Sequence, residues 1–170
     1  ATLALGPAPG LGVGVLVSVV LFLRHSARPH IPELGEVPGE RVYRNVNRHD
    51  VVTRPELVIA RVDAPLSFTS ARPIAERLAG LVRNRPEARY LVIDCTAINT
   101  ADFTGVDMLG TLSEELSATG VEVHLAAMRG PVSDILSRDA AYRTMVEQGR
   151  VHRSVPEAVD ALGGPAGGSA

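Results

Sequence analysis

Residues 99–107, NTADFTGVD, place several side chains that could do chemistry next to one another. Asp102, Thr104 and Asp107 fall at the start of a helix-like pattern, and Asp94 ends the apolar run YLVID shortly upstream. In α/β proteins the carboxyl ends of strands border the functional crevice, so this position favours a functional role. The residue types allow three interpretations: a catalytic carboxylate pair, a phosphorylated switch, or the start of a helix.

Catalysis is the interpretation with the least support from the neighbouring residues. Paired-carboxylate hydrolysis needs two carboxyl groups facing each other at roughly 5–9.5 Å, and Asp102 and Asp107 straddle a helix start. No histidine or nucleophilic cysteine stands nearby to form a relay. The chain has 17 arginines and no lysine, so it cannot contain the lysine of a phosphate-binding P-loop. We therefore expect that the chain is not an enzyme.

The helix-start and switch interpretations both involve the hydroxyl of Thr104. Thr104 followed by Asp107 resembles a capping box, with acidic side chains at the positive end of the helix. Gly105 would let the first turn pack closely against another segment. Phosphorylation of Thr104 would instead add about two negative charges between Asp102 and Asp107, and this crowding would disturb an interface. The residues alone leave both interpretations open.

The composition limits the partners and the cofactors. The formal net charge of −2 provides no basic field for nucleic acid. Cys95 is the only cysteine, which excludes a disulfide framework. The five histidines are scattered and none pair at ligand spacing, so we expect neither a metal site nor a bound cofactor.

The first residues differ in character from the rest of the 170-residue chain. Residues 1–23 contain no ionisable side chain, and Arg24, His25 and Arg28 follow them. This pattern predicts that residues 1–25 are the end of a transmembrane segment whose basic end faces the cytoplasm. A signal peptide would carry its basic residues first. A buried core helix remains the alternative.

Patterning predicts one α/β domain over residues 42–162, after a proline-rich extended linker, 26–41, and before a flexible tail, 163–170. The expected strands are 42–46, 56–64, 90–94, 121–128 (half-exposed) and 150–154. The expected helices are 74–82, 106–116, 130–140 and 154–162. Their alternation predicts a small mixed β-sheet of four to five strands covered by about four helices. The first two strands are expected to form a hairpin at one edge.

Four sequence stretches carry a resemblance to a known family. The strand end VID followed by D-F-T-G-V is similar to the STAS domain, whose bacterial antagonist members carry a D-S-S-G motif with a phosphorylatable hydroxyl before the glycine. Thr104 takes that position, Asp102 and Gly105 match, and Phe103 departs. The linker RPHIPELGEVPGERVYRNVNRH, DAPLSFTSA (63–71) and RGPVSDIL (129–136) resemble the SulP-type permease branch.

The resemblance implies a cytoplasmic STAS domain at the C-terminus of a membrane anion transporter, joined to the end of its last membrane helix. The anion would bind outside this chain, and the implied partners are the membrane, a second copy through the transporter, and a regulatory protein. Thr104 would be the phospho-acceptor, within an interaction loop of Asp102, Phe103, Gly105 and Asp107. A nucleotide crevice is implied at Pro65, Leu66, Phe68 and Asp94. The alternative is a free-standing anti-sigma-factor antagonist switched at Thr104.

Overall fold

The computed structural model describes residues 7–26 and 29–163 of the chain. The predicted tail, 163–170, lies outside the described residues except for Gly163, and so do residues 1–6 of the predicted membrane segment. The first described element is helix α2 (Pro7–Ser26), on which eight large apolar side chains between Leu11 and Leu21 are exposed. None of the helices in the described ranges is both long and apolar enough to cross a membrane.

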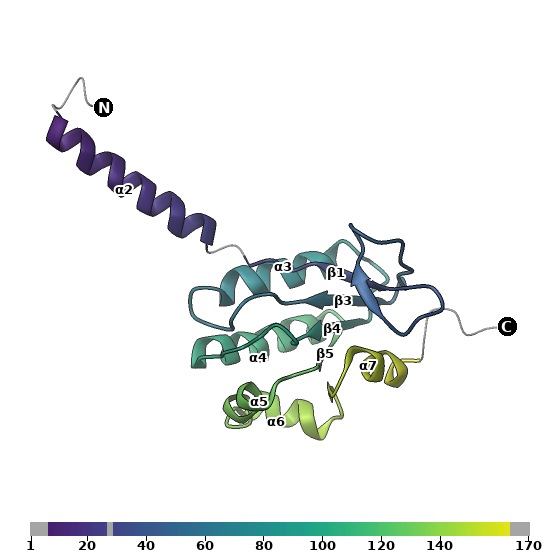
Figure 1. Cartoon of the computed structure of the whole chain (residues 1–170). Coiled ribbons are helices and arrows are strands. Elements are labelled where there is room, and N and C mark those ends of the chain that lie inside the picture. Colours follow the sequence, from purple (N-terminus) through teal and green to yellow (C-terminus); the bar gives the residue numbers. More distant parts are fainter. Residues whose placement is uncertain (1–6, 27–28, 164–170) are drawn as a thin grey trace.

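A six-stranded mixed sheet forms the centre of the domain (Figure 1). Its strands are β1 (Glu33–Glu36), β2 (Tyr43–Asn45), β3 (Leu57–Arg61), β4 (Tyr90–Asp94), β5 (Glu122–Ala126) and β6 (Val151–His152). They are ordered β2-β1-β3-β4-β5-β6. Strands β3 to β6 are parallel, and β1 is antiparallel to both of its neighbours. The result is an α/β fold, as predicted.

Helices cover both faces of this sheet. They are α3 (Ala71–Arg83), α4 (Phe103–Ala118), α5 (Gly130–Leu136), α6 (Ala140–Glu147) and α7 (Val155–Ala161). Buried residues of α3 to α6 pack with one set of strand residues, such as Leu91 and Leu125. On the other face α7 packs on the alternate residues, such as Ile59 and Val92. Because β4 is buried on both faces, it is the continuous apolar run that the sequence shows.

The side of the sheet formed by β2 and β1 differs from the prediction. Strand β1 lies inside the segment expected to be an extended linker and pairs with both β2 and β3. The expected hairpin between β2 and β3 is therefore wrong, because β1 separates them, and the sheet has six strands instead of four to five. Pro32 and Pro38 flank β1 without interrupting it, and Leu34 within it is buried.

The second half of the domain also differs in two places. The expected helix 130–140 is two helices, because Asp139 accepts a hydrogen bond from the amide of Tyr142 (3.1 Å) and begins α6. Strand β5 is buried at every residue except Glu122, so its expected half-exposed face is wrong. The second face is covered because β6 and α7 pack beside it. Gly120 follows the end of α4 with a φ of 84°, a left-handed conformation that favours glycine after a helix.

Burial of β5 places two histidines in contact. His124 Nδ1 and His152 Nε2 are 3.0 Å apart, and their rings stack at 5.3 Å between centroids. Burial, together with the charges of His152 and Arg150, lowers the pKa of His124 to about 4. Burial also lowers the pKa of His152, although Glu157 opposes this. The folded domain therefore stabilises the neutral form of both imidazoles relative to the charged form.

We predict that the domain loses stability between pH 7 and pH 5. The unfolded chain takes up a proton on His124 near pH 6.5 while the folded chain does not, so acidification favours unfolding. For a folded pKa of about 4 this costs about 2 kcal/mol at pH 5. Urea unfolding at both pH values measures the loss. His124→Leu should reduce the difference, whereas His49→Leu, at an exposed position, should retain it. An unchanged difference in His124→Leu would contradict the assignment.

Candidate functional site

The predicted site residues lie on two loops at the edge of the sheet where the carboxyl ends of β3 and β4 lie, and this is called the edge from here on. Strands β3 and β4 are adjacent and parallel, so both end at this edge, and loops 62–70 and 95–102 follow them. The amide of Leu66 donates to the carbonyl of Thr100 (3.0 Å), and the carbonyl of Leu66 accepts from the amide of Asp102 (2.8 Å). The two loops thus continue the pairing of the strands beyond the sheet.

Asp102 joins the loops through its side chain. Oδ1 accepts from the amide of Gly105 and Oδ2 from the amide of Phe68, both at 2.9 Å. Asp102 is therefore the N-cap of α4, and the prediction that Thr104 caps this helix is wrong. The helix begins at Phe103, so Thr104 already lies in its first turn. Amide donors from Gly105, Phe68 and Thr104 lower the pKa of the Asp102 carboxyl.

Gly105 is the point of closest approach between the loops. A Cβ atom placed there would lie 2.3 Å from the carbonyl oxygen of Leu66 and 2.8 Å from its Cβ. No larger residue fits without moving the Leu66 backbone, which the amide of Asp102 holds in place. The predicted close packing of this glycine is confirmed, and its partner is loop 62–70.

Four candidate residues are exposed around this junction. Phe68 and Phe103 are 73% and 82% exposed, although they are large apolar side chains. Thr104 and Asp107 are exposed on the first turns of α4. The geometry therefore collects two aromatic rings, one hydroxyl and one carboxylate on a single surface. Sequence patterning identified the acidic residues and Thr104, but it did not show that the backbone of Phe68 is bound to Asp102, next to Phe103.

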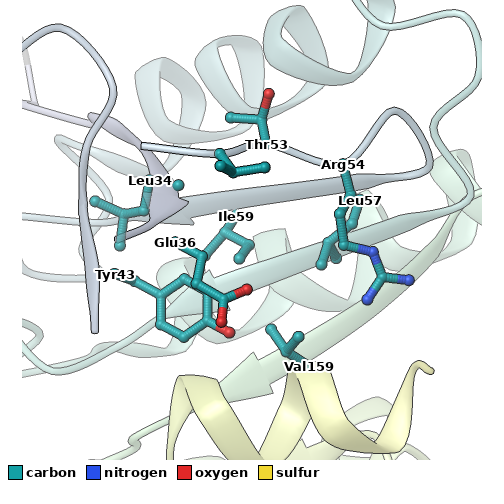
Figure 2. Close-up of a pocket in the computed structure, with 10 residues that line it drawn as sticks. Leu34, Glu36, Tyr43, Thr53, Arg54, Leu57, Ile59 and Val159 are labelled. Carbon is teal, nitrogen blue, oxygen red and sulfur yellow. The ribbon is translucent and has the colours of Figure 1, made fainter. Parts of the chain in front are cut away.

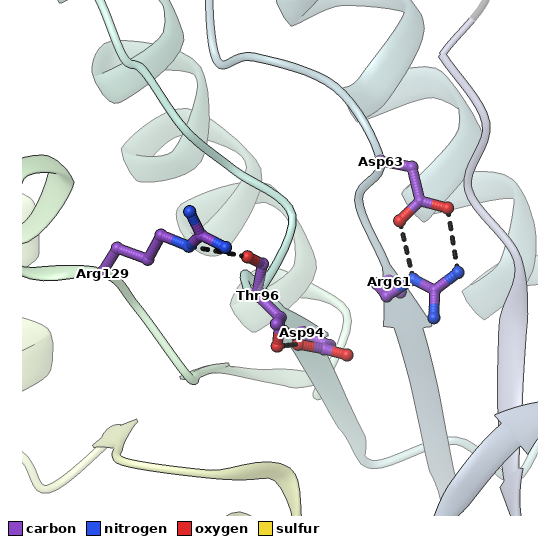
Figure 3. Close-up of polar contacts among 5 residues, drawn as sticks. All are labelled: Arg61, Asp63, Asp94, Thr96 and Arg129. Atoms are coloured by element: carbon purple, nitrogen blue, oxygen red, sulfur yellow. Dashed lines mark hydrogen bonds and ion pairs between the residues drawn. The ribbon is translucent and has the colours of Figure 1, made fainter.

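The remaining polar side chains at this edge hold the loops in place (Figure 3). Asp94 Oδ1 accepts from the amide of Thr96 (3.0 Å) and from its hydroxyl, and the carbonyl of Thr96 accepts from Arg129 Nε (3.1 Å). Arg61 donates to both carboxylate oxygens of Asp63, at 2.6 and 3.0 Å. Arg129 was missed because its partners, Thr96 and Asn99, lie on another loop, which a linear pattern does not reveal. Arg61 and Thr96 were missed although their partners are only two residues away.

The implied nucleotide crevice has few accessible groups. Leu66 is fully buried and Asp94 is 7% exposed, so of its four residues only Pro65 and Phe68 are exposed.

A hollow elsewhere in the domain is lined by Leu34, Glu36, Tyr43, Arg54 and Val159, among others (Figure 2). It lies between the β1–β2 hairpin and α7. Burial and Glu36 raise the pKa of Tyr43 there to about 12, so its phenol stays neutral.

The exposed groups at this edge are suited to recognition. Cys95 follows β4 directly but is completely buried, and burial raises the pKa of its thiol to about 12, so it is not a nucleophile. Across the described ranges, no three His, Cys, Asp or Glu side chains gather where they could hold a metal ion. An exposed hydroxyl between acidic neighbours and exposed rings suits a protein or lipid contact whose strength a charge on Thr104 would change.

Comparison with known families agrees with the fold and with this motif. The sequence model of the STAS domain matches residues 48–158, which include both loops and most of the sheet. The chain belongs to the STAS-domain family. Among solved structures, the murine Solute Carrier 26 family member A9 anion transporter aligns with a TM-score of 0.74 at 20% identity. It covers 89% of this STAS chain and 25% of the transporter.

Other relatives extend the similarity beyond the matched domain. A sulfate transporter family protein from Wolinella succinogenes aligns with a TM-score of 0.54 at 20% identity, over 65% of this chain and 87% of its own. Sulfate transporter 1.3 of Arabidopsis thaliana is 27% identical over 89% of this chain and 24% of its own length. A probable sulfate transporter of Mycobacterium tuberculosis is 29% identical over 95% of this chain and 29% of its own. This STAS chain thus spans about a quarter of these curated relatives.

We predict that Gly105→Ala destabilises this STAS domain by about 1–3 kcal/mol, because the new methyl group overlaps the Leu66 backbone. Gly80→Ala in α3 is the matched control. Its Cβ meets only the end of the Arg83 side chain, at 3.7 Å, and alanine favours a helix interior, so stability should stay equal or rise. Urea unfolding measures both variants. A Gly105→Ala variant as stable as Gly80→Ala would contradict the close approach.

Proposed function

We propose that this chain is the cytoplasmic regulatory and assembly domain of a secondary-active membrane transporter for an inorganic anion such as sulfate. In this proposal α2 is the end of the transporter's last membrane helix, and the anion binds in the membrane part, outside this chain. The domain itself is not an enzyme. It steadies or reports on the transporter, which forms a homodimer, and it contacts a regulatory protein through the exposed side chains of Thr104 and Asp107 on α4.

The observation that carries this proposal is the extent of the similarity to transporters. The mycobacterial relative aligns with 95% of the chain, whereas the family match begins only at residue 48. The 5% left out is about eight residues, so the alignment also includes most of the segment before the matched domain. That segment contains α2 with its exposed apolar side chains. A free-standing antagonist has no use for such a segment, which makes this alternative the weaker one.

The orientation follows from the basic residues at the end of the apolar run. Arg24, His25 and Arg28 come after it, and basic residues that flank a membrane helix favour the cytoplasmic side. The domain would therefore lie on the cytoplasmic side of the cell membrane. There Thr104 would be accessible to a kinase, because it is exposed.

Uptake of labelled sulfate by the complete gene product in vesicles tests the proposal. We predict uptake by the complete protein, and a reduced rate for Thr104→Glu, because a negative charge beside Asp107 alters the regulatory surface. Arg138→Glu, a charge change on the segment between α5 and α6, is the control and should transport at the original rate.

Absence of uptake for sulfate, bicarbonate and dicarboxylates alike would contradict the transporter proposal. Stoichiometric phosphothreonine at position 104 in protein from the native host, together with a start codon close to Ala1, would favour the antagonist instead.

A further inference from the structure

Phe68, on the loop that follows β3, and Phe103, directly after the neighbouring loop that follows β4, are both exposed and are called the Phe68–Phe103 pair here. Their backbones are held together by Asp102, which accepts from the Phe68 amide and directly precedes Phe103. The pair is 73% and 82% exposed, more than any other large apolar side chain described outside α2. Exposure of two large rings on neighbouring segments leaves apolar surface in water that a partner could cover.

The chain enters the domain at the same edge. The carbonyl of His30 accepts from the amide of Asp63 (3.0 Å), and the carbonyl of Pro32 accepts from the amide of Arg61 (3.1 Å). The entering segment thus lies beside the end of β3, from which loop 62–70 carries Phe68. Ser26, the last residue of α2, precedes His30 by four residues, which fully extended span at most about 14 Å.

We propose that the Phe68–Phe103 pair inserts into the surface of the lipid bilayer that surrounds α2. The inference rests on the proposed function, in which α2 belongs to the membrane. If the apolar residues of α2 lie in the hydrocarbon, Arg24 and His25 lie at headgroup level. The headgroup layer is only about 5–8 Å thick on each side. The tether to His30 therefore keeps the aromatic pair within reach of that layer.

Lipid is favoured over an acidic or basic protein partner by the state of the charges nearby. The cations at this edge are already engaged, since Arg61 pairs with Asp63, and Arg129 donates to Thr96 and Asn99. The Asp102 carboxylate is occupied by backbone amides. With these cations engaged, zwitterionic lipid without anionic headgroups is sufficient to bind the two rings, while Thr104 and Asp107 stay on the neighbouring exposed surface.

A tryptophan reporter tests this directly, because the chain contains no tryptophan. The single variants Phe103→Trp and Phe68→Trp are made in the full chain and mixed with phosphatidylcholine vesicles. Insertion predicts a blue shift of the emission, and a loss of emission when the acyl chains carry bromine near the headgroup. Val146→Trp is the control. Val146 is 51% exposed on α6, close in sequence to Gln148 and Arg150, which line a hollow with the start of β5. It therefore lies toward the opposite end of the strands from Phe68 and Phe103.

The outcomes separate this inference from the proposed function. Vesicle flotation of the unchanged chain reports whether α2 attaches to lipid. If the chain floats and bromine leaves Phe68→Trp and Phe103→Trp unquenched, the insertion is overturned and the membrane attachment stands. If the chain does not float, the insertion is overturned, whereas uptake by the complete protein still decides the proposed function. A blue shift that depends on protein concentration instead of lipid identifies a second copy as the occupant, and likewise overturns the inference.

Discussion

The candidate site depends on the carboxylate of Asp102, which accepts hydrogen bonds from backbone amides of two segments that follow different strands. One oxygen begins α4 at Gly105, and the other holds loop 62–70 at Phe68. Gly105 makes this contact sterically possible, because only a hydrogen atom fits against the Leu66 carbonyl. The parallel pairing of β3 with β4 brings both loops to one edge, but the Asp102 contact fixes their relation. The exposed rings and Thr104 take their positions from it.

This arrangement gives most of the acidic residues of the edge a structural role. Each carboxylate that appeared available in the sequence, apart from Asp107, has a structural partner. Asp94 holds the turn at Thr96, Asp63 pairs with Arg61, and Asp102 caps a helix. The groups left on the surface are apolar rings and a hydroxyl, which suit recognition. The family membership of the chain agrees with a domain that contacts and regulates, with transport itself placed in the proposed membrane part.

Predictions that depend on residues close together in the sequence were more accurate than those that depend on distant residues. The apolar run of β4 and the start of α5 at residue 130 were predicted, because short-range patterns determine them. Strand β1 was missed because its pairing with β3 joins residues far apart in the sequence. The capping residue of α4 was misplaced by two positions, since two candidate oxygens stood within one turn. Only the Phe68 amide, 34 residues away, makes Asp102 the better partner.

Amide hydrogen exchange in Asp102→Ala tests the central claim most directly. Without the carboxylate, the amides of Phe68 and Gly105 lose their acceptor and should exchange faster, while amides of the buried strand β4 should change less. Asp107→Ala, an exposed carboxylate on the same helix, should leave the Phe68 amide unchanged. Equal exchange of the Phe68 amide in Asp102→Ala, Asp107→Ala and the unchanged chain would contradict the account.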